Sequence, residues 1–430
     1  MRIIDVRRHE WAPLGWAAAW FFCVLASYYA IRPVRDAYGV NAGSNGLSWL
    51  FTATLAVTIA AAPIYSFVTT IVARRWLPMV VYGFFASNLA AFWLGLETLN
   101  ADDQTWLRWT FYVWVTVFNV YAVTVFWSFA VDRFSTDQAK RLFGLAAGAG
   151  TLGGLAGSEA ARWTVRLAGV EEVLWLSAGL MIAAIGCAWR FCLATPEGEP
   201  SVEPAAKPRA AKAGDNLRDA AAGLAAVMRS PYLAGIAALM VLSSIAATTI
   251  YMEISDVVRK EIASESARTD WYAKLNNYQN LFTLVGQALG ASWLIRRCGL
   301  GVTLVIVPAV YAIGYAVFAI HPTLVLLGAF DVAQRVASFA VGVPAREVLF
   351  TTVSPDEKYA AKALIDTVGK RTGDAIAAHG YAALRALHWT PAVISLAMLP
   401  LTAVIAGFSV ALGRQHGRQA KSVEAESRDR

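Results

Sequence analysis

The sequence predicts an all-α protein that crosses a membrane many times, and three observations support this fold class. Of its 430 residues, 57% are hydrophobic and only 16% are charged, whereas soluble domains carry about a quarter charged residues. The chain is also rich in tryptophan and glycine, with 16 and 32 residues, which is typical of helical membrane proteins. Apolar stretches of about 20 residues, long enough to cross a bilayer, recur about twelve times.

The predicted spans follow one another along the whole chain. They are residues 12–31, 47–72, 77–96, 107–131, 142–165, 170–192, 232–254, 277–295, 299–320, 324–349, 358–385 and 391–412. The first span follows a charged start, MRIIDVRRHEW, and has no A-x-A cleavage site. It is therefore predicted to be a retained span and not a removed leader.

Lysine and arginine residues set the predicted orientation, because they gather at the cytoplasmic ends of membrane helices. With the N-terminus inside, the even-numbered connections and the C-terminal tail are cytoplasmic. The connection after the seventh span is an exception, since it mixes basic residues with acidic ones. The basic residues on the predicted cytoplasmic side include Arg74, Arg75, Arg133, Lys140, Arg141, Lys207, Arg209, Lys212, Arg218, Arg229, Arg296, Arg297, Arg414, Arg418, Lys421, Arg428 and Arg430. Both termini are predicted to be cytoplasmic.

The longest internal connection divides the chain into two halves of about six spans each. It is rich in proline, alanine and charge, and it ends in an amphipathic piece from Asn216 to Met228. A duplicated six-helix architecture predicts such a linker. The predicted organisation is a six-helix bundle at 1–192, a cytoplasmic linker at 193–229, a second six-helix bundle at 230–413 and a cytoplasmic tail at 414–430.

Two stretches at equivalent places in the halves resemble each other. They are FSTDQAKRLFGLAAGAGTLGG (134–154) and VSPDEKYAAKALIDTVGKRTGD (353–374). Each opens on a capping-box pattern, Ser135 with Gln138 and Ser354 with Glu357, which predicts a helix start. These echoes favour a two-half transporter.

The tenth span contains Asp331 and Arg335, which share one helix face at i,i+4 spacing. Arg335 lies about 16 Å from the start of that span, near the bilayer midplane. A charge there is costly unless it faces a cavity or a partner. The two interpretations are a substrate cavity and a buried ion pair that fixes packing.

The eleventh span carries opposite charges every four residues, at Lys362, Asp366, Lys370 and Asp374, with Arg371 beside them. This spacing predicts a ladder of ion pairs along one helix face. The first interpretation is a helix that lines a cavity, because one more crossing is needed between the tenth and twelfth spans. The second is a solvated amphipathic helix.

The fifth span reads GLAAGAGTLGGLAG from Gly144 to Gly157, with glycines repeatedly four residues apart. Small residues at this spacing let helices approach closely in lipid. Gly148–Gly153 also matches the dinucleotide pattern G-x-G-x-x-G, but no strand precedes it, so the context for binding phosphate is missing. We find no catalytic motif, and we expect no enzyme activity, cofactor, metal site or nucleic-acid groove.

The stretch YYAIRPVRDAYGV (28–40) places Arg32, Pro33, Arg35 and Asp36 directly after the first apolar span. Pro33 is expected to kink or break any helix that continues past it. The charges are interpreted either as interfacial anchors or as a gate at the periplasmic mouth of a cavity. Glu253, at the periplasmic end of the seventh span, is a candidate partner for them across the two halves.

Three stretches resemble signatures of the major facilitator superfamily. They are SYYAIRPVRDAYGV (27–40), VFWSFAVDRFSTDQAKRLFGLAAGAGTLGG (125–154) and KYAAKALIDTVGKRTGD (358–374). The branch they resemble holds the ATP/ADP and NTP transporters of plastids and obligate intracellular bacteria. The resemblance implies a fold of about twelve helices in two pseudo-symmetric six-helix bundles, a central cavity and alternating access. It also implies the inner membrane of a bacterium.

The expected function is therefore secondary active transport of a small anionic or zwitterionic solute, with nucleotide-like anions the first substrate class. Arg335, Lys370 and Arg371 would bind the substrate, and Asp331, Asp366 and Asp374 would neutralise these cations in its absence. The alternatives are proton-coupled transport of another solute, such as a siderophore or a peptide, and a non-transporting partner protein with the same fold. We expect a monomer in the lipid bilayer whose further partners are a counter-substrate or H⁺.

Overall fold

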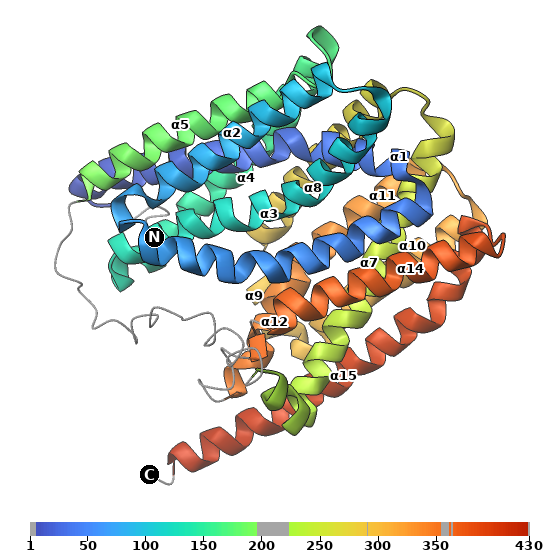
Figure 1. Ribbon diagram of the computed structural model, residues 1–430. Helices are drawn as coiled ribbons and strands as arrows, with labels where there is room; N and C mark the ends of the chain where they lie inside the picture. Colours follow the sequence, from blue (N-terminus) through green and yellow to red (C-terminus); the bar gives the residue numbers. More distant parts are fainter. Residues whose placement is uncertain (1–5, 196–222, 290, 354–360, 363, 429–430) are drawn as a thin grey trace. The chain divides into compact units, whose positions relative to one another are not determined.

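The computed structural model is helical throughout, and no strand occurs in the residues that it describes (Figure 1). These are all residues except 1–5, 196–222, 290, 354–360, 363 and 429–430. The helices are α1 (Trp11–Ile71), α2 (Leu77–Thr98), α3 (Ala101–Arg133), α4 (Thr136–Leu167), α5 (Val173–Ala194), α7 (Pro231–Glu261), α8 (Glu265–Leu289), α9 (Ala291–Cys298), α10 (Leu300–Ile320), α11 (Leu324–Val336), α12 (Val343–Leu349), α14 (Lys370–Ala386) and α15 (Pro391–Arg428). Two π-helical segments, Ala337–Gly342 and Ile365–Gly369, lie between α11 and α12 and directly before α14.

Helices occupy the predicted membrane spans wherever the structure describes them. Eight helical stretches are long and apolar enough to cross a membrane by length and composition, and α1 alone covers the first two predicted spans. The spans predicted at 142–165 and 277–295 lie on α4 and on α8 with α9, and the described part of the span at 358–385 lies mainly on the π-helical segment Ile365–Gly369 and α14. Glycines and polar side chains lower the hydropathy of these helices. The predicted all-α polytopic fold is confirmed.

The break expected at Pro33 lies elsewhere. Helix α1 continues through Pro33, and the one residue with non-helical backbone angles inside it is Gly43, at φ 66° and ψ 177°. Such a positive φ is easy for glycine because it has no side chain. The first membrane helix therefore extends about ten residues beyond its predicted end at residue 31. Arg32, Arg35 and Asp36 thus lie inside this helix and not in a connection after it.

The chain folds into two compact units, each built from segments that are far apart in the sequence. The first combines Met1–Gly39, Val57–Ala213 and Ile262–Asn280, and the second combines Val40–Ala56, Gly214–Glu261 and Leu281–Arg430. Helices α1 and α8 thus contribute residues to both units. The division into two six-helix halves at 193–229 stays a prediction.

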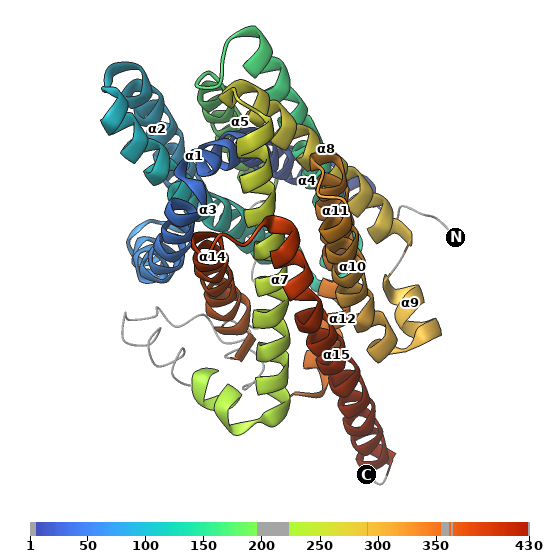
Figure 2. The ribbon, with the colours of Figure 1, turned by 90° about the vertical axis from the view of Figure 1, so that its right-hand side faces the viewer.

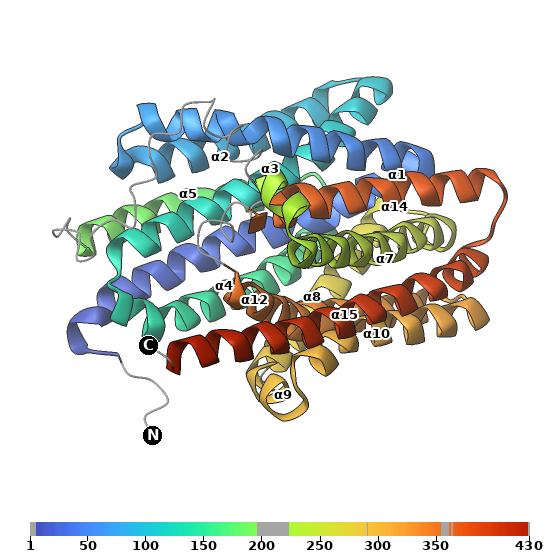
Figure 3. The ribbon, with the colours of Figure 1, turned by 90° about the horizontal axis from the view of Figure 1, so that it is seen from below.

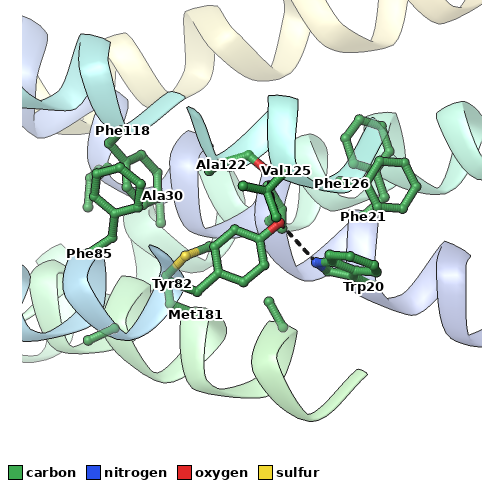
Figure 4. Close-up of a cluster of buried hydrophobic side chains, with 14 of the residues drawn as sticks. Trp20, Phe21, Ala30, Tyr82, Phe85, Phe118, Ala122, Val125, Phe126 and Met181 are labelled. Carbon is green, nitrogen blue, oxygen red and sulfur yellow. Dashed lines mark hydrogen bonds between the residues drawn. The ribbon is translucent and has the colours of Figure 1, made fainter. Parts of the chain in front are cut away.

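The core of the first unit is built on aromatic side chains from α1, α2, α3 and α5. Trp20 is fully buried, and its indole Nε1 donates a hydrogen bond to the Tyr82 hydroxyl at 3.1 Å (Figure 4). Tyr82 in turn donates to the Ala122 carbonyl at 3.0 Å, so neither polar group is left unpaired in the core. Phe126 packs edge-on against Trp20 with ring centroids 5.3 Å apart. Helices α2 and α5 lie side by side around this cluster (Figure 1).

The glycine run of α4 lets this helix approach α1 closely, as predicted. A Cβ added at Gly153 would lie 2.9 Å from the Phe22 carbonyl carbon, and one at Gly157 would lie 2.7 Å from that of Ala26. These distances are too short for a side chain. The pattern G-x-G-x-x-G therefore serves helix packing here and does not cradle a phosphate.

The start of α4 also fixes the segment that precedes α1. The capping box predicted at Ser135 is present, with both reciprocal hydrogen bonds to Gln138; the one predicted at Ser354 and Glu357 lies outside the described residues. Arg141 donates to both carboxylate oxygens of Glu10, at 2.9 and 3.1 Å. This hydrogen-bonded guanidinium lowers the pKa of Glu10 to about 2.

The second unit packs α7 against α14 and α10 against α15 (Figures 2 and 3). Gly373 brings α14 onto α7, because a Cβ there would lie 2.7 Å from the Val241 carbonyl oxygen and 2.8 Å from the Ser244 Cβ. Helices α10 and α15 touch at a glycine pair, Gly301 and Gly413. Close contact between α7 and α14 is what holds the charged face of α14 against polar groups of α7.

Substituting Gly157 with alanine should destabilise the protein, because the new methyl group meets the backbone of α1 and overpacking costs about 1 to 3 kcal/mol. Gly148→Ala is the matched control on the same helix, since no atom lies within 4 Å of the position that a Cβ at Gly148 would take. Thermal unfolding of the purified protein in detergent measures both. Equal melting temperatures for the two variants would contradict the close packing of α4 on α1.

Replacing Glu10 by glutamine should lower stability above about pH 4.5 and have little effect near pH 2. A carboxylate with a lowered pKa stabilises the folded state above its unfolded pKa, and this contribution is lost as the pH falls through the folded value. Glu10 is buried and its pKa lies at about 2. The measurement is the difference in melting temperature between wild type and Glu10→Gln across this range. A difference in melting temperature that does not become smaller on acidification would rule out the ionised pair of Glu10 and Arg141.

Candidate functional site

Four cations gather in the second unit, and we call Arg335, Arg346, Lys370 and Arg371 the basic cluster. Arg335 lies on α11, Arg346 on α12, and Lys370 and Arg371 begin α14. Lys370 interacts electrostatically with the other three and with Asp374. The structure thus brings together Arg335, Lys370 and Arg371, which the sequence pointed to, and adds Arg346.

The two π-helical segments border the basic cluster. One begins two residues after Arg335, and the other ends directly before Lys370. A π-helical turn is wider than an α-helical turn, is rare, and occurs often at functional sites. It also shifts the faces of the residues on either side of it, so charges spaced four apart in the sequence no longer stack in one row.

The predicted ladder along the eleventh span is wrong for this reason. Lys362 pairs with Glu347 on α12, with Nζ and Oε2 2.6 Å apart, and Asp366 pairs with Arg346, with Oδ1 and NH2 3.3 Å apart. The pairs therefore join neighbouring helical segments instead of successive turns of one helix. Within α14 the ion pair is Arg371 with Asp374, at i,i+3 and 3.5 Å.

Asp374 is a buried acid beside the basic cluster, with 6% of its surface exposed. It accepts hydrogen bonds from two hydroxyl groups of α7, those of Ser244 and Thr248, the latter at 2.8 Å. Three partners satisfy its charge, which is what a carboxylate in an apolar interior requires. Asp374 therefore has a structural role at the contact of α7 and α14.

Asp331 is also buried, and it accepts a hydrogen bond from the Gln334 side chain at 2.7 Å. The Gln334 amide oxygen accepts one from Tyr311 of α10 at 3.4 Å. This chain of polar groups connects α11 with α10 beside Arg335. Asp331 thus belongs to an internal network on the face of α11 that packs against α10.

Lys370 has a different setting from its neighbours. It lies in the α-helical row of Gly373, Asp374 and Ala377, which are buried on the side of α14 that packs against α7. Its side chain is nevertheless exposed, and within the described part of the chain its ammonium group forms no hydrogen bond or ion pair. A cation in a membrane helix requires water, a counter-charge or a solute as its partner.

Arg346, Glu347, Ser244 and Thr248 were not among the site residues predicted from the sequence. The first two lie inside the predicted span 324–349, and a charge in a membrane span is itself a signal of function. The hydroxyl groups of α7 give no comparable signal, because serine and threonine are common in membrane helices. Only the packing of α7 against α14 shows what they bind.

The candidate gate residues of the first unit lie within α1 and are buried. Arg32 and Asp36 are 9% and 3% exposed. Asp36 pairs with both arginines, at 3.3 Å from Arg35 and 3.8 Å from Arg32, and Arg35 also donates to the Tyr112 hydroxyl at 3.3 Å. The charges are thus held by protein partners in a helix that continues past them, and their role stays a prediction.

The fourth gate candidate, Glu253, lies on α7 in the second unit and is 0% exposed. Its Oε1 accepts a hydrogen bond from Ser395 of α15 at 2.7 Å. The partnership predicted between Glu253 and the arginines of α1 stays a prediction. Outside the gaps in the described chain, no three histidine, cysteine or acidic side chains are grouped as a metal ion would require.

Comparison with solved structures defines the class of fold. The chain superposes on the nucleoside transporter NupG with a TM-score of 0.61, at 14% identity, over 95% of this chain and 99% of that one. For the POT family transporter PepTSo the TM-score is 0.62, at 11% identity, over 96% and 98% of the two chains. A bacterial homolog of the human lysosomal transporter Spinster gives 0.53, at 13% identity, over 96% and 94%.

The chain has the major facilitator fold that these transporters share. No protein-family model matches the sequence, and no curated protein matches it. The fold prediction is thus confirmed, and the resemblance to ATP/ADP transporters stays at the level of a prediction.

Asp374→Ala should cost about 3 kcal/mol, because it leaves the partly buried guanidinium of Arg371 and the Thr248 hydroxyl without their acceptor. Asp366→Ala should cost about 1 kcal/mol or less, since the Asp366 side chain is 32% exposed and solvent screens its pair with Arg346. Thermal unfolding of the two purified variants gives the comparison. If Asp366→Ala proves the more damaging, the structural role assigned to Asp374 is incorrect.

Proposed function

We propose that the protein is a secondary active transporter that moves a small anionic or zwitterionic solute across a membrane by alternating access. The major facilitator fold supports transport over catalysis. The observation that carries the substrate class is Lys370, whose exposed side chain lies near three arginines on the side of α14 that packs against α7. An anion bound there would add a counter-charge to the basic cluster.

Charge-assisted hydrogen bonds from the basic cluster would hold the solute. Lys370 supplies a compact charge, whereas arginine side chains offer a planar fork that fits carboxylate or phosphate oxygens. Arg346 and Arg371 are engaged with Asp366 and Asp374, so a bound anion would compete with these acids. Each conformation would then have its own set of ion pairs, which is the condition for a ligand to shift a conformational equilibrium.

Nucleotide-like anions remain the first candidate substrates. The resemblance of residues 27–40, 125–154 and 358–374 to ATP/ADP transporters supports them, and they would be exchanged for a counter-substrate in an antiport cycle. The second candidate is proton-coupled transport of another solute, such as a peptide or a siderophore. The third is a partner protein with the same fold that transports nothing.

Arg32, Arg35, Asp36 and Glu253 are proposed as gate residues. The pairing of Asp36 with both arginines supports a latch within the first unit. The distribution of basic residues supports a bacterial inner membrane location, with both termini and the 193–229 linker cytoplasmic between two six-helix halves. We propose that the transporter acts as a monomer.

Lys370→Ala should weaken binding of the transported anion about 10- to 100-fold, because one hydrogen bond to a charged group contributes about 1.5 to 3 kcal/mol. A thermal-shift screen of the purified protein against anionic metabolites, ATP and ADP included, identifies the ligand, since binding raises apparent stability. Counterflow of the labelled ligand in proteoliposomes then measures transport by each variant.

The matched control is Arg75→Ala, which removes an exposed cation from a connection between helices and should leave transport unchanged. Counterflow without a pH gradient supports exchange, and uptake that requires an imposed gradient supports proton coupling. Unchanged transport by Lys370→Ala would contradict the assigned site, and absence of flux for every anion that stabilises the protein would favour the partner-protein alternative.

A further inference from the structure

Glu253 is a carboxyl group enclosed inside a membrane-spanning helix. It lies on α7 with 0% of its surface exposed, and its Oε1 accepts the hydrogen bond from Ser395 of α15. Its second oxygen, Oε2, is buried and has no hydrogen-bond partner among the residues with described positions. Asp374 on α14, by contrast, has three partners.

Among the described residues, the groups that interact electrostatically with Glu253 do not include a cation. They are Asp256 on the same helix, Tyr315 on α10 and Tyr381 on α14. The nearby Arg385 is committed to Asp256, with Nε and Oδ2 2.6 Å apart. The Tyr315 and Tyr381 hydroxyl groups donate to the Ala246 carbonyl and to the Asp256 carboxylate.

An ionised carboxylate with one hydrogen bond is costly in an apolar interior, whereas the neutral acid costs far less. Asp256 faces a guanidinium and a phenol. Glu253 suits the protonated form. Glu253 and Asp256 lie one helical turn apart in different environments. Glu253 is suited to bind a proton, and Asp256 forms an ion pair.

A cavity supplies the access that a proton needs. It lies in the second unit, has a volume of about 840 Å³, and its lining includes Asp256, His379, Arg385 and Lys260. Asp256 lines this space and interacts electrostatically with Glu253. The two acids are three residues apart, about 4.5 Å along the helix axis. Under the predicted topology this end of α7 faces the periplasm.

We propose that Glu253 is a proton-binding site, loaded through the cavity at Asp256, whose protonation holds the conformation seen here. The inference rests on the second candidate of the proposed function, proton-coupled transport, and names the residue that would bind the coupling proton. The step is a simple equilibrium in which the carboxylate takes up one proton and becomes a carboxylic acid. Loss of that proton creates a buried charge that this conformation does not stabilise, so ionisation favours a conformation in which Glu253 reaches water or a cation.

Infrared spectroscopy of the purified protein in lipid tests the protonation directly, because a protonated carboxyl group has a C=O stretching band distinct from a carboxylate. We expect a band at neutral pH that disappears in Glu253→Gln and persists in Glu261→Gln, an exposed acid on the same helix. Ser395→Ala should shift the band to higher frequency, since the hydrogen bond to the carbonyl oxygen is lost. This variant keeps the test decisive if Glu253→Gln folds poorly.

A second measurement addresses the conformation. Ala383, in the cavity wall, is replaced by cysteine in a protein without native cysteines, and its labelling by a membrane-impermeant maleimide is followed against pH. After correction for thiol ionisation, the labelling rate at position 383 should change with pH when Glu253 is present. With Glu253→Gln, the labelling rate should stay at the value that the protein with Glu253 has at low pH. No Glu253-dependent band at neutral pH, or an identical pH dependence in both proteins, would overturn the proposal. Neither measurement involves transport, so a failure here is distinct from a failure of the proposed transport function.

Discussion

The high cost of an unpaired charge away from water governs most of what this structure does with its polar residues. Each charged group in a helix of this fold needs an opposite charge, hydrogen bonds, a proton or access to water. Asp374 has hydroxyl groups and a guanidinium, Asp36 has two arginines, and Glu253 has one serine. Lys370 interacts electrostatically with Asp374 but forms no hydrogen bond or ion pair among the described residues, and its exposed side chain leaves water or a solute as its further partner.

The two units use charge in different ways. In the first unit the charged groups of α1 are closed off: Arg32, Arg35 and Asp36 satisfy one another, with Tyr112 as a further acceptor. In the second unit the basic cluster is bordered by π-helical segments and keeps an exposed lysine. The paired charges of α1 are suited to a latch, and the basic cluster with its exposed lysine is suited to binding a ligand. The proposals for gate and substrate residues follow this difference.

Hydropathy and turn chemistry were sufficient to predict the fold, because apolar length and capping residues are local properties of the chain. They predicted the helices, the capping box at Ser135 and the close approach allowed by Gly153 and Gly157. The path of α1 was harder: a proline in a membrane helix can be tolerated when packing supports the backbone, and the break falls at Gly43 instead. Where a helix breaks depends on neighbours that the sequence does not specify.

The site was predictable by residue type and less so by partner. Intramembrane charge pointed to Arg335, Lys370 and Asp374, but spacing alone paired Asp366 within its own helix, whereas it binds Arg346. The π-helical segments alter the register, and no pattern in the sequence indicated them. Ser244 and Thr248 became visible only through the packing of α7 on α14, which brings distant parts of the chain together.

The central claim is that the space around Lys370 is an aqueous binding cavity. Cysteine accessibility tests it most directly, with Lys370→Cys and Ile376→Cys each introduced into a protein whose four native cysteines have been replaced. Ile376 is equally suitable for labelling, since it is 52% exposed, but it lies about 120° around α14 from Lys370. We predict fast modification of Lys370→Cys by a charged, hydrophilic thiol reagent in membranes and slow modification of Ile376→Cys. Slow modification at position 370, or equal rates at the two positions, would contradict the account.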